Sequence, residues 1–393
     1  MRILLSALLL LTTIISFGQS GTQKVQDSFN AITTAVPFLN IAPDSRSSAM
    51  GDVGVALTPD VNSIHWNPSK LAFLEDDFGV SLSYVPWLRA LVPDMNIAYL
   101  SAFKKINETS TIGTSLRYFS LGRLIFTDDQ ANNVGEFTPS EFAYDVAYSL
   151  KLSDQFSSGV ALRYVYSNLT GGSQTAGSDT KPGTAFAFDF SMYYQSKKFN
   201  MSDKDAIFRA GLNLSNIGNK MTYNTGGSAD KNFLPANMRL GAALTVEIDD
   251  YNNVTFSTDL NKLLVPTPGG SLDTSSSDVS TASAVFGSFN DAPGGTTEEL
   301  QEINLGFGIE YNYDNKLAFR TGFFNEPKNK GNRQFITLGA GLAYSILQFD
   351  LSYLIATQQN SPLANSLRIT ISAIVNKKGG SGTTGGANPV ILD

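Results

Sequence analysis

The chain lacks the residues on which several kinds of chemistry depend. Its 393 residues include no cysteine and a single histidine, which excludes disulfide scaffolds, thiolate metal sites and sites built from several histidines. Only 16% of the residues are charged, against about 25% in an average soluble domain, and the net charge is −7. Because nucleic acid is bound through basic surfaces, this balance excludes nucleic acid as a partner.

Sequence motifs of common enzymes are also missing. The chain has no Gly-x-Ser-x-Gly, His-Glu-x-x-His or phosphate-loop pattern, so we predict no catalytic residue, no metal site and no cofactor. The one histidine, His65, stands between Ile64 and Trp66. We interpret it as a packed or hydrogen-bonded residue, and the alternative is a catalytic base.

After the N-terminus there is no long apolar run. Residues 1–18 combine Arg2, an apolar stretch and the small residues Ser16 and Gly18, which is typical of a secretory signal peptide cleaved before Gln19. A membrane anchor is the alternative, but the stretch is short and lacks a stop-transfer flank. At the other end, residues 377–393 form a Gly-rich tail that we expect to be a flexible linker.

The strongest pattern in the chain is an alternation with a period of two. Between Phe142 and Leu150, large apolar residues alternate with small or polar ones, as expected for a strand with one apolar face. Fourteen such segments occur: 78–87, 95–104, 109–119, 141–151, 156–167, 184–195, 207–215, 236–248, 252–262, 301–313, 315–324, 334–346, 348–357 and 366–376.

The connections between these segments predict how they are arranged. Each odd-numbered connection is longer than the even-numbered one after it, and the longest spans residues 263–300. Long loops alternating with short turns, with an even strand number, are typical of outer-membrane barrels. We therefore predict an all-β, 14-stranded antiparallel transmembrane barrel over residues 78–376, with both chain ends in the periplasm. A large β-sandwich is the alternative.

The charged residues of the segments share one face. If that face lines the lumen, a polar interior with ion pairs follows. Leu305 then faces lipid, so Leu305→Arg should impair assembly, whereas Gly306 faces the lumen and Gly306→Ser should assemble. The charged positions are Arg117, Asp145, Arg163, Asp189, Arg209, Arg239, Glu247, Asp259, Glu310, Arg320, Asp350 and Arg368.

Residues 19–77 precede the first predicted strand and lack its alternation. Asp44 and Asp60 are candidate N-caps of short helices. A barrel of fourteen strands has a lumen wide enough to hold a compact segment. We therefore predict that residues 19–77 form a plug, and we single out the motif Asn67-Pro68-Ser69.

The plug region carries a family resemblance. Gly51–Ala56 and Asn62–Ala72 resemble the N-terminal hatch of FadL-like outer-membrane proteins, in which Asn67-Pro68-Ser69 matches an Asn-Pro-Ala-type motif; Leu234–Gly241 also resembles a family segment. The resemblance implies a 14-stranded barrel closed by a hatch. Within this superfamily the chain resembles the PorV family of type IX secretion proteins, through Ser81–Leu88, Tyr118–Gly122, Phe256–Lys262 and Leu338–Leu342.

Two long connections hold apolar residues, which suggests contacts with a protein partner. The alternative is that these residues fold over the barrel mouth and pack on each other. The candidate binding residues are Leu121, Leu124, Ile125 and Phe126 in the connection 120–140, and Val285, Phe286 and Phe289 in the connection 263–300.

The PorV resemblance implies a function without catalysis. Such proteins bind the C-terminal signal domain of exported cargo, dock on the translocon barrel (Sov/SprA) and pass cargo to the attachment complex with the sortase PorU. The barrel wall itself would contact membrane lipid. A FadL-like transporter of hydrophobic small molecules and a plain structural barrel are the alternatives.

Overall fold

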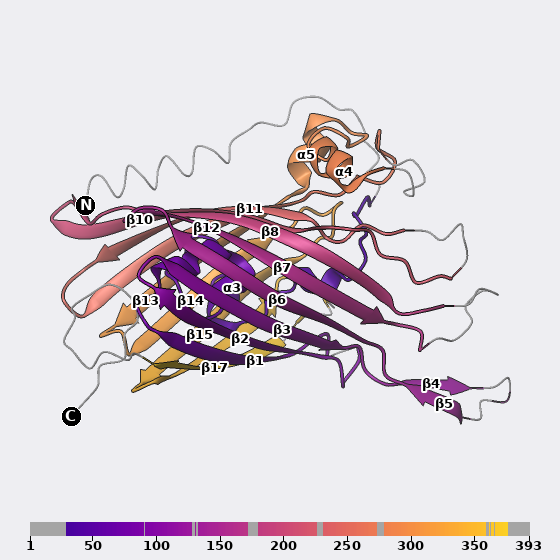
Figure 1. Ribbon diagram of the computed structural model, residues 1–393, viewed down its shortest axis with the longest axis horizontal. Coiled ribbons are helices and arrows are strands. Elements are labelled where there is room, and N and C mark those ends of the chain that lie inside the picture. The colour runs from indigo at the N-terminus through magenta and orange to yellow at the C-terminus, as the bar shows by residue number, and fades with distance from the viewer. Residues whose placement is uncertain are drawn as a thin grey trace.

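The computed structural model describes residues 29–375 apart from 90, 128–129, 131–132, 172–179, 226–230, 273–278, 359–360, 362 and 365. The predicted signal peptide and Gly-rich tail lie outside these residues. The described chain forms a tilted β-barrel with short helices inside it and at one end (Figure 1).

The predicted strands are confirmed, with bounds that agree within three residues. The strands are β1 (Phe78–Pro86), β2 (Asn96–Asn107), β3 (Ser110–Ser120), β4 (Leu124–Thr127), β5 (Asn133–Phe137), β6 (Ser140–Lys151), β7 (Phe156–Asn168), β8 (Gly183–Gln195), β9 (Phe199–Met201), β10 (Lys204–Gly218), β11 (Asn237–Glu247), β12 (Asn252–Leu263), β13 (Ile303–Tyr313), β14 (Leu317–Asn325), β15 (Gln334–Tyr344), β16 (Leu347–Ala356) and β17 (Ser366–Val375).

Fourteen of these strands close into an antiparallel barrel. Neighbours in the wall follow the chain order, with β3 next to β6 and β8 next to β10. The barrel closes where β17 pairs with β1, in a register that places Phe78 opposite Val375. The short strand β9 adds to the end of β10, and β4 pairs only with β5 in a separate hairpin.

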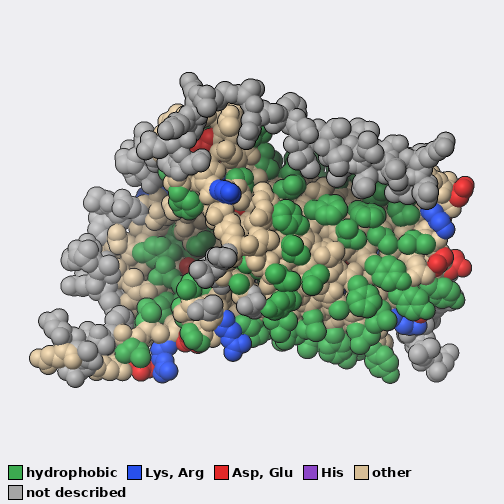
Figure 2. Space-filling view, turned by 180° about the vertical axis from the view of Figure 1, so that it is seen from behind, with side chains coloured by type: hydrophobic (Ala, Val, Ile, Leu, Met, Phe, Trp, Pro, Cys, Tyr) green, Lys and Arg blue, Asp and Glu red, His purple; other side chains and the backbone are tan. Residues whose placement is uncertain are grey.

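The alternation decides which side chains face outward. Leu305 and Phe307 are 41% and 39% exposed on the outer wall, and Figure 2 shows hydrophobic side chains over much of that surface. Eleven of the twelve predicted lumen charges are buried. Glu247 differs because it lies at the end of its strand, where its side chain is half-buried and pairs with Lys198 at 2.7 Å.

The two ends of the barrel differ, as the connection lengths predict. Short turns join β2 to β3 and β6 to β7 at the end where β1 begins, which we call the turn rim. The opposite end, the loop rim, carries the β4–β5 hairpin and two helices, α4 (Thr281–Gly287) and α5 (Thr296–Gln301). Figure 1 shows the hairpin projecting away from the barrel wall.

The plug is built from four short helices: η1 (Pro37–Asn40), α2 (Ser45–Ser48), α3 (Ser63–Trp66) and η2 (Pro68–Phe73). Asp44 caps α2 as predicted, accepting the N–H of Ser47 over 3.0 Å. The N-cap prediction for Asp60 is wrong, because Asn62 precedes α3. Asp60 instead accepts a hydrogen bond from Arg46.

The plug enters the barrel from the loop rim. We predict both ends of the chain on the periplasmic side; the end of β17 lies at the turn rim, and the N-terminal end lies outside the described residues. The N–H of Asn30 donates to the carbonyl of Asn329, in the loop between β14 and β15 at the loop rim. The described chain therefore begins at the loop rim and crosses the lumen before it reaches β1.

Among the described helices, none combines the length and the apolar character needed to cross a membrane.

Candidate functional site

The plug contacts the barrel wall through glycines that leave no room for a side chain. A Cβ atom added to Gly306 would lie 2.7 Å from the carbonyl oxygen of Gly51, and one at Gly308 would lie 2.5 Å from that of Met50. Gly322 is equally crowded by Met50 and Gly51. Gly306 thus faces the lumen as predicted, but the plug backbone fills the space that parity alone leaves open. Assembly of Gly306→Ser stays a prediction.

The motif Asn67-Pro68-Ser69 fastens the plug to the wall. The Asn67 side chain, fully buried, donates to the carbonyls of Val55 and Met192 over 3.0 and 2.9 Å. Wall serines bind the motif backbone: Ser149 donates to the Pro68 carbonyl over 2.6 Å and Ser157 to the Ser69 carbonyl over 2.7 Å. These contacts give the motif a structural role.

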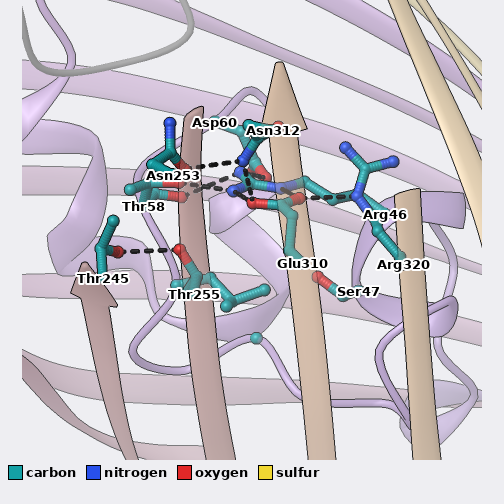
Figure 3. Close-up of polar contacts among 12 residues, drawn as sticks. Arg46, Ser47, Thr58, Asp60, Thr245, Asn253, Thr255, Glu310, Asn312 and Arg320 are labelled. Carbon is teal, nitrogen blue, oxygen red and sulfur yellow. Dashed lines mark hydrogen bonds and ion pairs between the residues drawn. The ribbon is translucent and has the colours of Figure 1, made fainter. Parts of the chain in front are cut away.

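An ion network closes the lumen on the side of the turn rim. Arg46 of the plug donates to Glu310 of β13 through two nitrogens, over 3.0 and 2.9 Å, and to Asp60 over 3.0 Å. Arg320 of β14 donates to the same Glu310 over 2.6 Å and to Asp350 over 2.6 Å. Figure 3 shows Arg46, Asp60, Glu310 and Arg320 converging from the plug and the wall.

A vestibule lies between this network and the turn rim, where it opens. Its volume is about 1010 Å³, and its lining includes Arg46, Glu310 and Arg320 together with turn residues such as Lys204 and Asp250. The vestibule is polar, and it ends where the plug begins.

His65 lies among arginines inside the plug. Its Nδ1 faces a guanidinium nitrogen of Arg117 at 2.7 Å and its Nε2 faces one of Arg239 at 3.4 Å. Burial, followed by the charges of Arg117 and Arg239, lowers the pKa of His65 well below its ordinary value, so the ring is neutral. Both ring nitrogens face wall residues, which supports the interpretation of His65 as a packing residue.

Within the described residues, no three His, Asp or Glu side chains are grouped closely enough to hold a metal ion.

The described residues of the connection between β12 and β13, 264–272 and 279–302, form a cap at the loop rim. In this cap one of the predicted binding residues is buried and two are exposed. Val285 of α4 is 9% exposed and packs with Ala284, Phe233 and Leu264. Phe286 and Phe289 are 79% and 47% exposed. Val285 therefore belongs to the core of the cap, whereas the two phenylalanines remain available to a partner.

Charged residues that the sequence analysis did not single out anchor the cap. Lys262 of β12 pairs with Glu299 and Glu302 of the cap at 3.0 and 2.5 Å. Lys330 pairs with Glu298 and Glu302 at 2.6 and 2.9 Å. The local sequence pattern does not predict these ion pairs, because the paired residues come from different strands and loops.

The other predicted binding residues lie on or beside the β4–β5 hairpin. Leu124 and Ile125 are 47% and 55% exposed. Leu121 is partly buried and packs against the apolar cluster around Phe38 and Phe119. The side chain of Phe126 lies outside what the structure describes.

A closed barrel with an apolar outer wall and a plug folded into its lumen defines a plugged β-barrel of the outer-membrane type. The crystal structure of the P. putida toluene transporter TodX matches with a TM-score of 0.52 and 13% identity, over 85% of this chain and 98% of that chain. A deltaS2S3 mutant of TodX gives 0.50 and 13%, over 85% and 98%. A Pseudomonas aeruginosa FadL homologue gives 0.44 and 11%, over 89% and 100%. These likenesses concern the fold.

The sequence identifies the family to which the chain belongs. The profile of the type IX secretion system protein PorV matches residues 23–270, more than half of the chain. The chain therefore belongs to the PorV family of the type IX secretion system, and it is a protein of the outer membrane. No curated protein matches the chain.

Proposed function

We propose that the protein is a cargo-binding component of type IX secretion and catalyses no reaction. It binds the C-terminal signal domain of exported proteins at the loop rim, docks on the translocon barrel (Sov/SprA) and passes cargo to the sortase PorU complex. The observation that carries this proposal is the exposure of three large apolar side chains of the cap, Phe286, Phe289 and Leu300. Leu300 is 66% exposed, between the values of the two phenylalanines.

These side chains have the properties of a protein-binding surface. A few aromatic residues carry most of the affinity in typical interfaces, and exposed apolar patches commonly mark sites of protein interaction. The ion pairs of Lys262 and Lys330 attach the cap to the rim. A preorganised cap loses little entropy when a partner binds.

The filled lumen supports recognition at the rim. The plug meets the wall backbone at Gly306 and Gly308, and Arg46 binds Glu310 across the lumen. A protein that acts through its loops needs no passage through the barrel.

A FadL-like transporter of hydrophobic small molecules is the second candidate, favoured by the fold shared with the toluene transporter TodX. Such a function requires a path with an apolar lining. The vestibule of this protein is lined by many charged side chains, among them the ion-paired Glu310 and Arg320, which argues for the first candidate.

The test is co-purification of cargo and translocon with a tagged Phe286→Asp, Phe289→Asp variant. We expect both partners to be lost at unchanged outer-membrane abundance, because the charges lie at exposed positions and leave the barrel intact. The matched control is Leu152→Asp, which alters a 55% exposed leucine in the turn between β6 and β7. Deleting residues 268–293 is a poorer test, since it also removes the buried Val285.

Unchanged recovery of cargo and translocon with the double variant would contradict the proposal. Impaired uptake of a hydrophobic compound, with normal secretion, would favour the transporter instead.

A further inference from the structure

The described start of the chain, residues 29–36, runs between the cap and the plug and touches both. Asn30 fixes its outer end through three hydrogen bonds. The backbone N–H donates to the carbonyl of Asn329 over 2.8 Å. The side-chain Nδ2 donates to Glu298 of α5 over 2.8 Å and to the carbonyl of Pro268 over 3.1 Å. The start of the chain is therefore attached to the cap and to a neighbouring loop.

The middle of this segment shares the core of the cap. Ile32 packs against the apolar cluster that contains Ala284 and Val285 of α4. The N–H of Ala35 then donates to the carbonyl of Phe233 over 2.9 Å. Ile32, which lies just before the plug in the chain, thus contributes to the apolar packing that holds α4 on the barrel.

The inner end of the segment begins the plug under strain. Val36 is 1% exposed and has a φ of 46°, a backbone conformation that β-branched residues rarely adopt. Beyond it, Arg117 of the wall donates to the carbonyls of Phe38 and Leu39 over 3.0 and 2.8 Å. The same guanidinium contacts His65 of α3 at 2.7 Å. The contacts therefore continue from α5 to the centre of the plug.

We propose that residues 29–36 are a strap that couples the cap to the plug, so that a protein seated on the cap changes how tightly the upper plug is held. The cap cannot move away from the rim without breaking the bonds of Asn30 or drawing Ile32 with it. The strained backbone at Val36 lowers the cost of releasing the segment. The identity of the partner rests on the proposed function, whereas the coupling itself is a property of the isolated protein.

The coupling is tested by hydrogen–deuterium exchange on the full-length protein in detergent. Ala284→Asp places a charge in the core of the cap, at a residue with no exposed surface. We expect exchange of residues 35–41 to accelerate about tenfold, within the range of typical coupling energies. The matched control, Phe286→Asp, puts the same charge on the exposed face of the same helix and should leave residues 35–41 unchanged.

Two further variants keep the test decisive if Ala284→Asp fails to assemble. Thr281→Val removes a milder cap contact, the 2.9 Å hydrogen bond to the carbonyl of Gly218, and should accelerate the same residues by about threefold. Asn30→Ala removes the two side-chain bonds that attach the strap to Glu298 and Pro268. In this background the response of residues 35–41 to Thr281→Val should become smaller.

Faster exchange confined to residues 279–301, with residues 35–41 unaffected in both cap variants, would overturn the coupling. Cargo recovery is measured separately. Unchanged cargo recovery with the Phe286→Asp, Phe289→Asp variant refutes the binding proposal alone. Unchanged exchange of residues 35–41 in both Ala284→Asp and Thr281→Val refutes the strap alone.

Discussion

Arg46 and Glu310, which are 264 residues apart in the chain, form a two-pronged ion pair across the lumen, with nitrogen–oxygen distances of 3.0 and 2.9 Å. The pair joins the plug to β13. Arg320 binds the same carboxylate from β14, so Glu310 connects the plug to two adjacent strands of the wall.

Removing Arg46 should loosen the plug and leave the barrel in place. In Arg46→Ala, Asp60 loses its ion-pair partner and Glu310 keeps only the wall residues Arg320 and Asn312, which should weaken the plug by about 3 kcal/mol. Amide exchange of residues 44–60 reports this loss, and sensitivity of cells to vancomycin reports any leak. Arg46→Lys keeps the charge without the paired geometry and should give an intermediate effect. Exchange equal to wild type in Arg46→Ala would mean that the pair does not hold the plug.

Substitutions at Leu305 and Gly306 should have different effects on the barrel and the plug. Leu305→Arg puts a charge on the lipid face, at a cost of about 2–4 kcal/mol, and should lower the amount of folded barrel on heat-modifiability gels. Leu305→Val is the matched control and should fold normally.

Gly306→Ala should leave the barrel folded but displace the plug, because its Cβ would lie 2.7 Å from the Gly51 carbonyl oxygen and from a Val53 methyl. Amide exchange of residues 50–55 checks this result. Wild-type exchange in Gly306→Ala would show that the plug shifts at no cost.

The start of the described chain should be accessible from outside the cell. Phe29 is 69% exposed at the loop rim, and the absence of native cysteine gives a clean background for Phe29→Cys. A membrane-impermeant maleimide should label this variant on intact cells.

The control for this orientation is Glu108→Cys. The side chain of Glu108 is 86% exposed in the turn between β2 and β3, so it should be labelled only after the outer membrane is permeabilised. The opposite labelling pattern would mean that the barrel has the inverse orientation in the membrane.

The bond between the strap and the cap should weaken in acid. Burial alone would raise the pKa of Glu298, but hydrogen bonds from Lys330, the Gly294 N–H and Asn30 outweigh it and hold the pKa below its usual value of 4.5. A carboxylate with a lowered folded-state pKa stabilises the fold above its unfolded pKa, and this stabilisation disappears as the pH falls through the folded value.

Fluorescence anisotropy of a dye on Phe29→Cys should therefore decrease as the pH falls below about 4.5. Adding Glu298→Gln should remove this dependence, because the amide does not titrate. A pH response that persists in Glu298→Gln would assign it to another group.

The order, length and parity of the strands could be predicted from the sequence, because a period of two is a local property of an extended chain. The segment 301–313 shows both consequences: Leu305 faces outward and Glu310 faces the lumen. The unequal connections predicted which ends of the strands carry the loops, since short turns join adjacent antiparallel strands directly. The family resemblance of the plug motif was likewise visible in Asn67-Pro68-Ser69.

Only the tertiary structure decided which residues meet inside and above the barrel. Val285 and Phe286 are neighbours in one apolar stretch, yet packing against Leu264 buries the first while the second is exposed. The strand parity predicts only that Gly306 faces the lumen, and the structure shows that the plug backbone occupies the space beside it. The direction of the plug and the pairing of Arg46 with Glu310 depend on contacts between residues far apart in the chain, and no local period encodes them.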